Sequence, residues 1–284
     1  MINILAASLI VIVAVAAAHA LPDQSPETPA RHGHERQARE QGKRGFLSSS
    51  TSHNASRRPR ANAAQFSCDF PVFGLDSVDC EYMASIGMLG QGFNAQDENG
   101  RIWIGPQGPN RFTFVNAAGV PITLIVWYMA PYDDQASFMN ARAPDISYSL
   151  PTTGSAVEVS LANGVPGAWS ALYNHSTTLS PYGQINNTFG EFSTGSYATI
   201  DLSRLVNMWG DQMTVIVSGG CVSNMATCVY TCVSEGDNSC GAAGTYNLLN
   251  CVGPNAVQYI DPEGNPTGGC QGWSFGGDIQ IVMT

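Results

Sequence analysis

Apolar and polar residues alternate with a period of two along much of the chain after residue 110. The alternation is clearest over 111–115, 157–161, 198–202, 213–217 and 279–281. Because side chains alternate between the two faces of a strand, each of these segments predicts a strand with one buried face. A nearly continuous apolar run over 122–128 predicts a strand that is buried on both faces. Glycine and proline interrupt the pattern repeatedly, which disfavours long helices.

Many short alternating strands in one chain predict a mostly β fold, an antiparallel β-sandwich. Residues 221–270 have a different composition, rich in Cys, Gly and Asn. We expect this disulfide-rich C-terminal lobe to depend on its cross-links for order. Residues 61–284 are therefore predicted to form one domain. The role of residues 61–110 stays open, although Cys68 and Cys80 suggest a small stapled loop there.

The first 60 residues differ from this domain. The apolar run Ile4–Ala18, closed by Ala18-His19-Ala20, predicts a secretory signal peptide over residues 1–20. The run is shorter than the roughly 20 apolar residues that a membrane span needs. Residues 21–60 are rich in Ser, Pro, Gln and Arg and poor in apolar surface, which predicts a disordered propeptide or leader. We therefore expect a secreted protein, extracellular or in the cell wall.

The charge after residue 60 is strongly negative. This part of the chain has no Lys, and its basic residues are Arg101, Arg111, Arg142 and Arg204, against a large excess of Asp and Glu. Such a surface repels phosphate groups, which excludes nucleic acids and acidic membranes as partners. The tail 276–284 has no hydrophobic stretch of the kind removed during lipid anchoring, so we expect no membrane anchor.

The chain has an even number of cysteines, all of them after the leader. They are Cys68, Cys80, Cys221, Cys228, Cys232, Cys240, Cys251 and Cys270. In a secreted protein this predicts four disulfides, whose connectivity the sequence leaves open. Oxidised cysteines do not ligate metals, so we expect no metal and no cofactor. Asn174 and Asn186 begin Asn-x-Ser/Thr sequons in polar stretches, which predicts N-glycosylation at these two residues.

Several short motifs follow one another in the middle of the chain. They are Phe112–Asn116, Thr123–Trp127, Val165–Ser170, Phe189–Ser193, Tyr197–Ser203 and Gly219–Cys221. Their order over about residues 110–240 resembles that of the thaumatin-like (osmotin) family. The resemblance implies a β-sandwich with a disulfide lobe and an acidic cleft between them. Members of this family bind β-1,3-glucans, and some hydrolyse them weakly.

Carried over by position, the resemblance makes Glu191 and Asp201 the acids of the cleft. Sugars stack on aromatic rings, and the candidates are Trp103, Trp127, Trp169, Trp209 and Trp273, with Trp169 in the motif nearest the cleft. The family's cleft arginine, expected after Trp169, is missing. Val206 and Asn207 stand where its second aspartate is expected, and half of its cysteines are absent.

The spacing of the two acids allows a geometric expectation. If Thr194–Ser196 turns a hairpin, Asp201 is a diagonal neighbour of Glu191, at about 7–8 Å between Cα atoms. Such a pair is compatible with the carboxyl separation of roughly 6.5–9.5 Å in inverting glycosidases. As catalytic residues, Glu191 and Asp201 therefore remain candidates only.

Three functions are compatible with these observations. The first is a secreted, monomeric protein that binds cell-wall β-1,3-glucan through Glu191 and Asp201. The second is a non-catalytic wall-structural or host-interaction protein. The third, which the missing aspartate disfavours, is a low-activity β-1,3-glucanase. Exposed aromatic side chains beside Glu191 would favour the first, and separation of the two acids onto different surfaces would favour the second.

Overall fold

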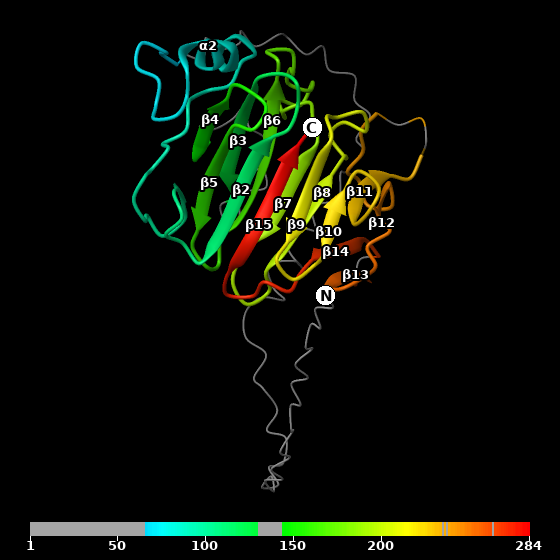
Figure 1. Cartoon of the computed structure of the whole chain (residues 1–284). Coiled ribbons are helices and arrows are strands. Elements are labelled where there is room, and N and C mark those ends of the chain that lie inside the picture. The colour runs from blue at the N-terminus through cyan, green and yellow to red at the C-terminus, as the bar shows by residue number, and fades with distance from the viewer. Residues whose placement is uncertain (1–65, 130–143, 235, 237, 263) are drawn as a thin grey trace, which may run out of the picture. The chain divides into compact units, whose positions relative to one another are not determined.

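The computed structural model describes residues 66–129, 144–234, 236, 238–262 and 264–284. The signal peptide predicted over 1–20 and the leader predicted over 21–60 lie outside the described residues. All described residues belong to one compact unit of the chain, Asn54–Thr284. This unit is mostly β, with two sheets and, in its described part, a single helix (Figure 1). No helix in the described ranges is long and apolar enough to cross a membrane.

The first sheet has six strands, and its two central strands come from opposite ends of the domain. The order is β1 (Ile102–Ile104), β5 (Ala156–Leu161), β2 (Asn110–Asn116), β15 (Gly277–Met283), β9 (Met213–Val217) and β10 (Val222–Asn224). Strands β2 and β15 run parallel, side by side, over their full lengths (Figure 1). The last strand of the chain is thus inserted beside an early one.

The second sheet has nine strands. Seven of them follow the order β12 (Tyr246–Leu249), β11 (Val229–Cys232), β8 (Thr199–Ser203), β7 (Phe189–Ser193), β6 (Pro166–Tyr173), β3 (Ile122–Tyr128) and β4 (Ile146–Leu150). The hairpin of β13 (Ala256–Ile260) and β14 (Pro266–Cys270) joins β8 through Cys270 and Ile200. Strand β11 pairs with β8 in parallel. Most strand pairs of the two sheets are antiparallel as predicted, and β2 with β15 and β11 with β8 are the parallel exceptions.

Strand burial follows the predicted patterns. Buried and half-buried residues alternate along β2, whereas β3 is buried on both faces. Ile122, Leu124 and Val126 of β3 face a core shared by the two sheets, in which the ring of Phe112 meets the ring of Trp169. The opposite face of β3 packs in a second core beneath α2 (Ser77–Ser85). The continuous apolar run of β3 is explained by these two cores.

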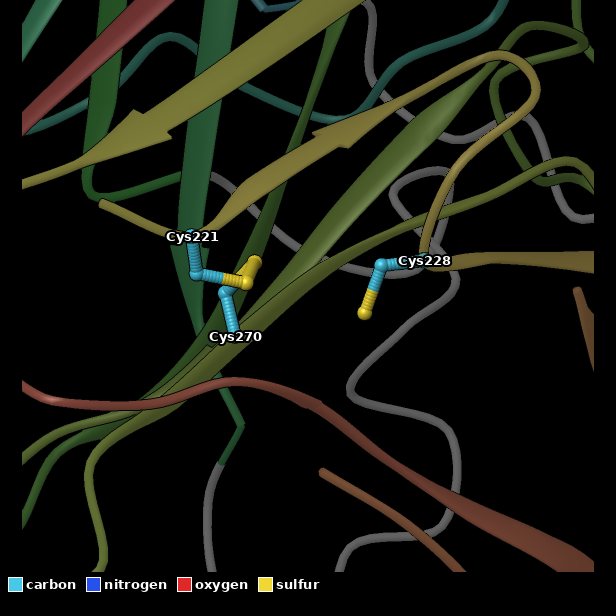
Figure 2. A group of neighbouring side chains, drawn as sticks. All are labelled: Cys221, Cys228 and Cys270. Carbon is cyan, nitrogen blue, oxygen red and sulfur yellow. A yellow bond between two sulfur atoms is a disulfide. The ribbon is translucent and has the colours of Figure 1, made fainter. Parts of the chain in front are cut away.

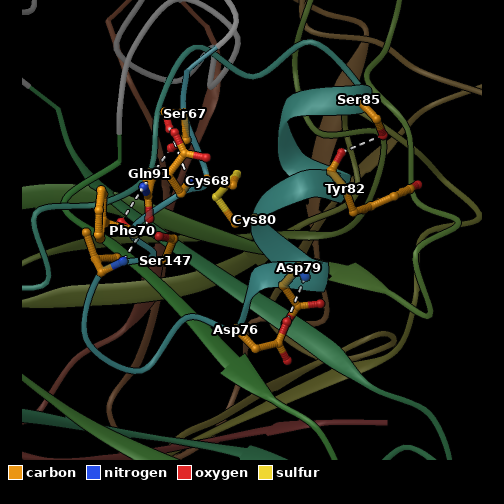
Figure 3. Close-up of a disulfide and its surroundings, with 12 residues drawn as sticks. Ser67, Cys68, Phe70, Asp76, Asp79, Cys80, Tyr82, Ser85, Gln91 and Ser147 are labelled. Atoms are coloured by element: carbon orange, nitrogen blue, oxygen red, sulfur yellow. Dashed lines mark hydrogen bonds between the residues drawn. A yellow bond between two sulfur atoms is a disulfide. The ribbon is translucent and has the colours of Figure 1, made fainter.

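Helix α2 corrects the prediction of a stapled loop. The disulfide Cys68–Cys80 is present, but Cys80 lies inside the helix (Figure 3). The helix begins because the side chain of Asp76 accepts a hydrogen bond from the backbone N–H of Asp79. Cys80 and Met83 are fully buried. The helix thus covers the outer face of β3 and lies away from the disulfide-rich segment.

The other three disulfides all lie within residues 221–270, which confirms that this segment is disulfide-rich. The pairs are Cys221–Cys270, Cys228–Cys251 and Cys232–Cys240. Figure 2 shows Cys228 beside the Cys221–Cys270 disulfide, and the three sulfur atoms lie within 4.8 Å of one another. Because all three sulfurs are in disulfides, they are not thiolate ligands for a metal ion. Multiple disulfides are compatible with an extracellular protein.

Candidate functional site

Glu191 and Asp201 lie directly opposite each other on neighbouring strands. The antiparallel register of β7 and β8 pairs Glu191 with Asp201 and Ser193 with Thr199. The expected diagonal arrangement was wrong because five residues, 194–198, connect the strands where three were expected. Ala198 belongs to this connection and is buried. Directly opposed residues share one face of the sheet, with Cβ atoms about 4.5–5.5 Å apart.

The two carboxyls differ in exposure. Glu191 is half-buried, whereas Asp201 is only 7% exposed and its Oδ1 atom has no hydrogen-bond partner among the described residues. Gly269 of β14 lies over Asp201, because a Cβ atom at this glycine would stand 3.3 Å from Asp201 Oδ2. The backbone of Gly269 has a φ of +144°, which L side chains rarely adopt. A glycine therefore allows β14 to approach the acid pair closely.

Burial and mutual repulsion change the protonation of the pair. Burial raises the pKa of Glu191. The pKa of Asp201 is raised well above its ordinary value by burial and then by the charge of Glu191. Two close carboxyls in a poorly solvated place do not both ionise readily. Ionisation of one of these carboxyls therefore disfavours ionisation of the other.

Glu191 opens into a cleft of about 1150 Å³. Its walls come from three connections, around residues 180–186, 205–209 and 238–245. A smaller hollow of about 300 Å³ shares Glu191, Leu205 and Gly241 with it. Glu191 thus stands where two neighbouring hollows meet. Neither hollow has Lys or Arg among the described residues of its lining, so both are anionic or neutral throughout.

The smaller hollow carries one acid and two phenols that sequence reasoning missed. Tyr230, Tyr246 and Asp261 line it together with Glu191. Burial, followed by the charges of Asp201 and Glu191, raises the pKa of Tyr230. Burial, followed by the charges of Asp261 and Glu191, raises the pKa of Tyr246. Both phenols therefore keep their protons and can donate hydrogen bonds at neutral pH. The sequence held no signal that the segment carrying Tyr230, Tyr246 and Asp261 would fold beside Glu191 of β7.

Two strongly exposed aromatic residues line the larger cleft. Trp209 is 76% exposed and Tyr182 is 75% exposed. Trp209 is fixed by two hydrogen bonds, from its backbone N–H to Asn207 Oδ1 at 2.9 Å and from Nε1 to Asn238 Oδ1 at 3.1 Å. The indole is therefore exposed but held in place. No local pattern set it apart from the other four tryptophans, since its immediate neighbours in the sequence are Met208 and Gly210.

Trp169 does not line the cleft, which corrects its assignment as a sugar-binding residue. Its side chain is fully buried, and its ring packs against Phe112, Phe114 and Phe192 in the core between the sheets. A Cβ atom at Gly190 would collide with it. The remaining buried tryptophans are Trp103, Trp127 and Trp273, each at most 2% exposed. A buried indole cannot stack on a sugar.

No arginine directly follows Trp169, and the next arginine in the sequence, Arg204, serves a different purpose. The guanidinium of Arg204 donates hydrogen bonds to the carbonyls of Met208 and Met225. It thereby braces the connection that carries Trp209, and it does not line either hollow.

The two sequon asparagines lie in different surroundings. Both are exposed. Asn174 stands in a turn after β6, with a φ of +49°, next to His175, which pairs with Asp79 of α2. Asn186 lines the larger cleft.

Comparison with known proteins adds no assignment. No protein-family model matches the chain, and no curated protein is significantly similar to it. A proposal about function therefore rests on the geometry of the cleft and on the chemistry of the side chains that line it.

Proposed function

We propose that this chain is a secreted, thaumatin-like protein whose two sheets form a β-sandwich, and that it binds neutral cell-wall polysaccharide, β-1,3-glucan, in the cleft around Glu191. The observation that carries the proposal is one cleft that combines a carboxyl at its floor with two exposed aromatic rings. Sugars present hydroxyls, which hydrogen-bond to carboxylates and phenols, and apolar C–H faces, which pack on aromatic rings.

The charge of the cleft selects among polysaccharides. Its described lining has Glu191 but no basic side chain, and Asp261 adds a second acid in the adjoining hollow. Uronic acids, sulfates and phosphates would be repelled at close range. The cleft therefore favours uncharged glucans over acidic polysaccharides.

The arrangement supports binding more strongly than hydrolysis. A glycosidase needs two carboxyls that both reach the glycosidic bond, about 5–5.5 Å apart in retaining enzymes. A directly opposed pair, with Cβ atoms about 4.5–5.5 Å apart, is closer to that spacing than the expected diagonal pair would be. Asp201, however, is almost fully buried and lies beneath Gly269. A single accessible carboxyl disfavours the glucanase alternative.

The non-catalytic wall-structural or host-interaction alternative required the two acids to lie on separate surfaces. Glu191 and Asp201 instead face each other. This juxtaposition supports the binding hypothesis over that alternative.

The test is retention of the secreted chain on insoluble β-1,3-glucan, chitin and cellulose. We expect selective retention on β-1,3-glucan, lost in Trp209→Ala and reduced in Glu191→Gln. The matched controls are Tyr197→Ala, an 84% exposed aromatic outside both hollows, and Glu98→Gln, an exposed acid outside them. Both controls should bind as the natural chain does. Failure to bind any polymer, or equal loss in Tyr197→Ala, would reject the cleft as a glucan site.

A further inference from the structure

The sequon Asn186-Asn187-Thr188 lies on the wall of the cleft. The side chain of Asn186 is exposed to the cleft and makes no hydrogen bond with any described residue, whereas Asn187 and Thr188 are buried. A group attached to Asn186 Nδ2 would therefore stand at the cleft. This position distinguishes Asn186 from an ordinary surface sequon.

A short chain of hydrogen bonds links Asn186 to Trp209. Asn207 Nδ2 donates to the carbonyl oxygen of Asn186 at 3.1 Å, and Asn207 Oδ1 accepts from the backbone N–H of Trp209 at 2.9 Å. One side chain thus connects the 180–186 wall to the 205–209 wall. Asn186 and Trp209 line the same cleft, and Asn207 holds their backbones together.

We infer that Asn186 is N-glycosylated and that the first sugars of this glycan pack against Trp209, so that the glycan controls access to the cleft. The amide Nδ2 attacks C1 of a lipid-linked oligosaccharide diphosphate. The C1–Nδ2 bond forms as the bond from C1 to the diphosphate oxygen breaks, and the transferase removes one amide proton. The effect of the glycan on glucan binding rests on the proposed function, whereas its contact with Trp209 does not.

The folded structure also dictates when this modification takes place. Thr188 is fully buried, and Asn187 Nδ2 donates to Ala171 O at 2.9 Å and to Asp211 Oδ2 at 2.8 Å. A transferase that reads the sequon must reach its threonine, so it acts before β7 pairs with β6. The sequon at Asn174 differs, because its Ser176 is exposed after folding.

The chain offers a matched control and a built-in probe. Asn174 is exposed but lines neither hollow, so Asn174→Gln removes a glycan that lies outside the cleft. Trp209 is 76% exposed, and the other four tryptophans are at most 2% exposed. Quenching of tryptophan fluorescence by acrylamide therefore reports on Trp209 alone.

The experiment uses the full chain secreted from a glycosylating eukaryotic host. Mass spectrometry should find a glycan on the peptide that contains Asn186. Acrylamide quenching should rise about twofold in Asn186→Gln, since a sugar on one of the two ring faces shields about half of the indole. Trimming the natural chain with an endoglycosidase should raise quenching in the same direction without any substitution. Asn174→Gln should leave it unchanged. An unoccupied Asn186, or equal quenching in all forms, would overturn the inference.

Glucan retention then separates this inference from the proposed function. We expect Asn186→Gln to bind β-1,3-glucan about tenfold more tightly than the glycosylated chain, which is about 1.4 kcal/mol. If quenching rises but no form binds any polymer, the glycan inference stands and the proposed function fails. If every form binds equally while quenching rises, the glycan contacts Trp209 without controlling the cleft, and that part of the inference is wrong.

Discussion

Asp79 and Asp201 are both almost fully buried aspartates, in two regions of the same domain, and their surroundings are opposite. Asp79 accepts a hydrogen bond from Ser149 Oγ at 2.5 Å and pairs with His175 Nε2 at 2.6 Å. Asp201 faces the like-charged Glu191, and in the part of the chain that the structure describes its Oδ1 atom accepts and donates no hydrogen bond. Asp79 links α2 to the second sheet, whereas Asp201 lies in surroundings that disfavour its ionised form.

The comparison separates a structural acid from a candidate functional one. A protein stabilises a buried charge by pairing it, and leaving one unpaired lowers stability. Unpaired polar groups are tolerated at sites where they serve another purpose. Asp201 lies beside a cleft, whereas Asp79 lies on the buried face of helix α2, so the two aspartates differ in location as well as in pairing.

Asp79→Ala tests the structural half of this comparison and should have the largest effect. It leaves Ser149 and His175 without their shared acceptor and should lower the free energy of unfolding by about 2–3 kcal/mol, measured by denaturant titration. The control Glu81→Gln, on an exposed position of the same helix, should change it by less than about 0.5 kcal/mol. Retention on β-1,3-glucan should stay unchanged in the folded fraction. Loss of glucan binding in Asp79→Ala would contradict the separation of roles.

Gly269→Ala tests the close approach of β14 to the acid pair. The added Cβ atom would stand 2.9 Å from the carbonyl oxygen of Ile200 and 3.3 Å from Asp201 Oδ2, on a backbone with φ near +144°. The strain should lower the free energy of unfolding by about 1–3 kcal/mol. The control is Gly154→Ala, also at a positive φ but with nothing within 4 Å of the added Cβ. Equal losses in the two variants would show that the approach to Asp201 contributes nothing.

Asp201→Asn tests the other aspartate of the comparison, the one beside the cleft. It should change the free energy of unfolding in the opposite direction to Asp79→Ala. Asparagine removes the charge while nearly keeping the shape, so the repulsion of Glu191 disappears. The free energy of unfolding at pH 7 should increase, by about 1.4 kcal/mol for each unit by which the pKa of Asp201 is raised. Chemical denaturation of both proteins at the same pH measures this difference. A loss of stability would show that Asp201 is paired in a way that resembles Asp79.

The smallest expected effect is on the pH dependence of stability. It tests the direction in which the pKa values of Glu191 and Asp201 are shifted. The folded-state pKa values of Glu191 and Asp201 are raised, so between the unfolded and folded values the folded chain binds more protons. Their contribution to stability is therefore complete below about pH 4 and is lost as the pH rises through the folded-state values. Denaturation midpoints measured from pH 4 to pH 8 should fall less steeply in Asp201→Asn than in the natural chain. Parallel curves would contradict the coupling.

Much of the strand pattern could be predicted from the sequence. Period-two alternation identified the strands that became β2, β5, β8, β9 and β15. The continuous apolar run of β3 correctly indicated burial on both faces. Helix α2 was missed because it is short and is stabilised by a disulfide and by Asp79, both of which depend on distant residues.

The candidate site was predicted only in part. Glu191 and Asp201 were identified together from short motifs, but their register depended on the length of the connection between β7 and β8. Asp261 and Tyr246 could not be linked to Glu191, because the disulfide-rich segment offered no pattern that specified its path. Among five tryptophans, the choice of Trp169 over Trp209 failed because composition does not distinguish a buried ring from an exposed one.

The sequence by itself determined the strands with regular alternation or a continuous apolar run, since both patterns are local properties of the chain. It also determined the negative charge of the domain and the number of cysteines available for pairing. Tertiary structure decided which side chains meet: the parallel pairing of β2 with β15, the four disulfide partners, and the cleft that unites Glu191 with Trp209. These outcomes depend on packing between segments far apart in the chain, which no local pattern records.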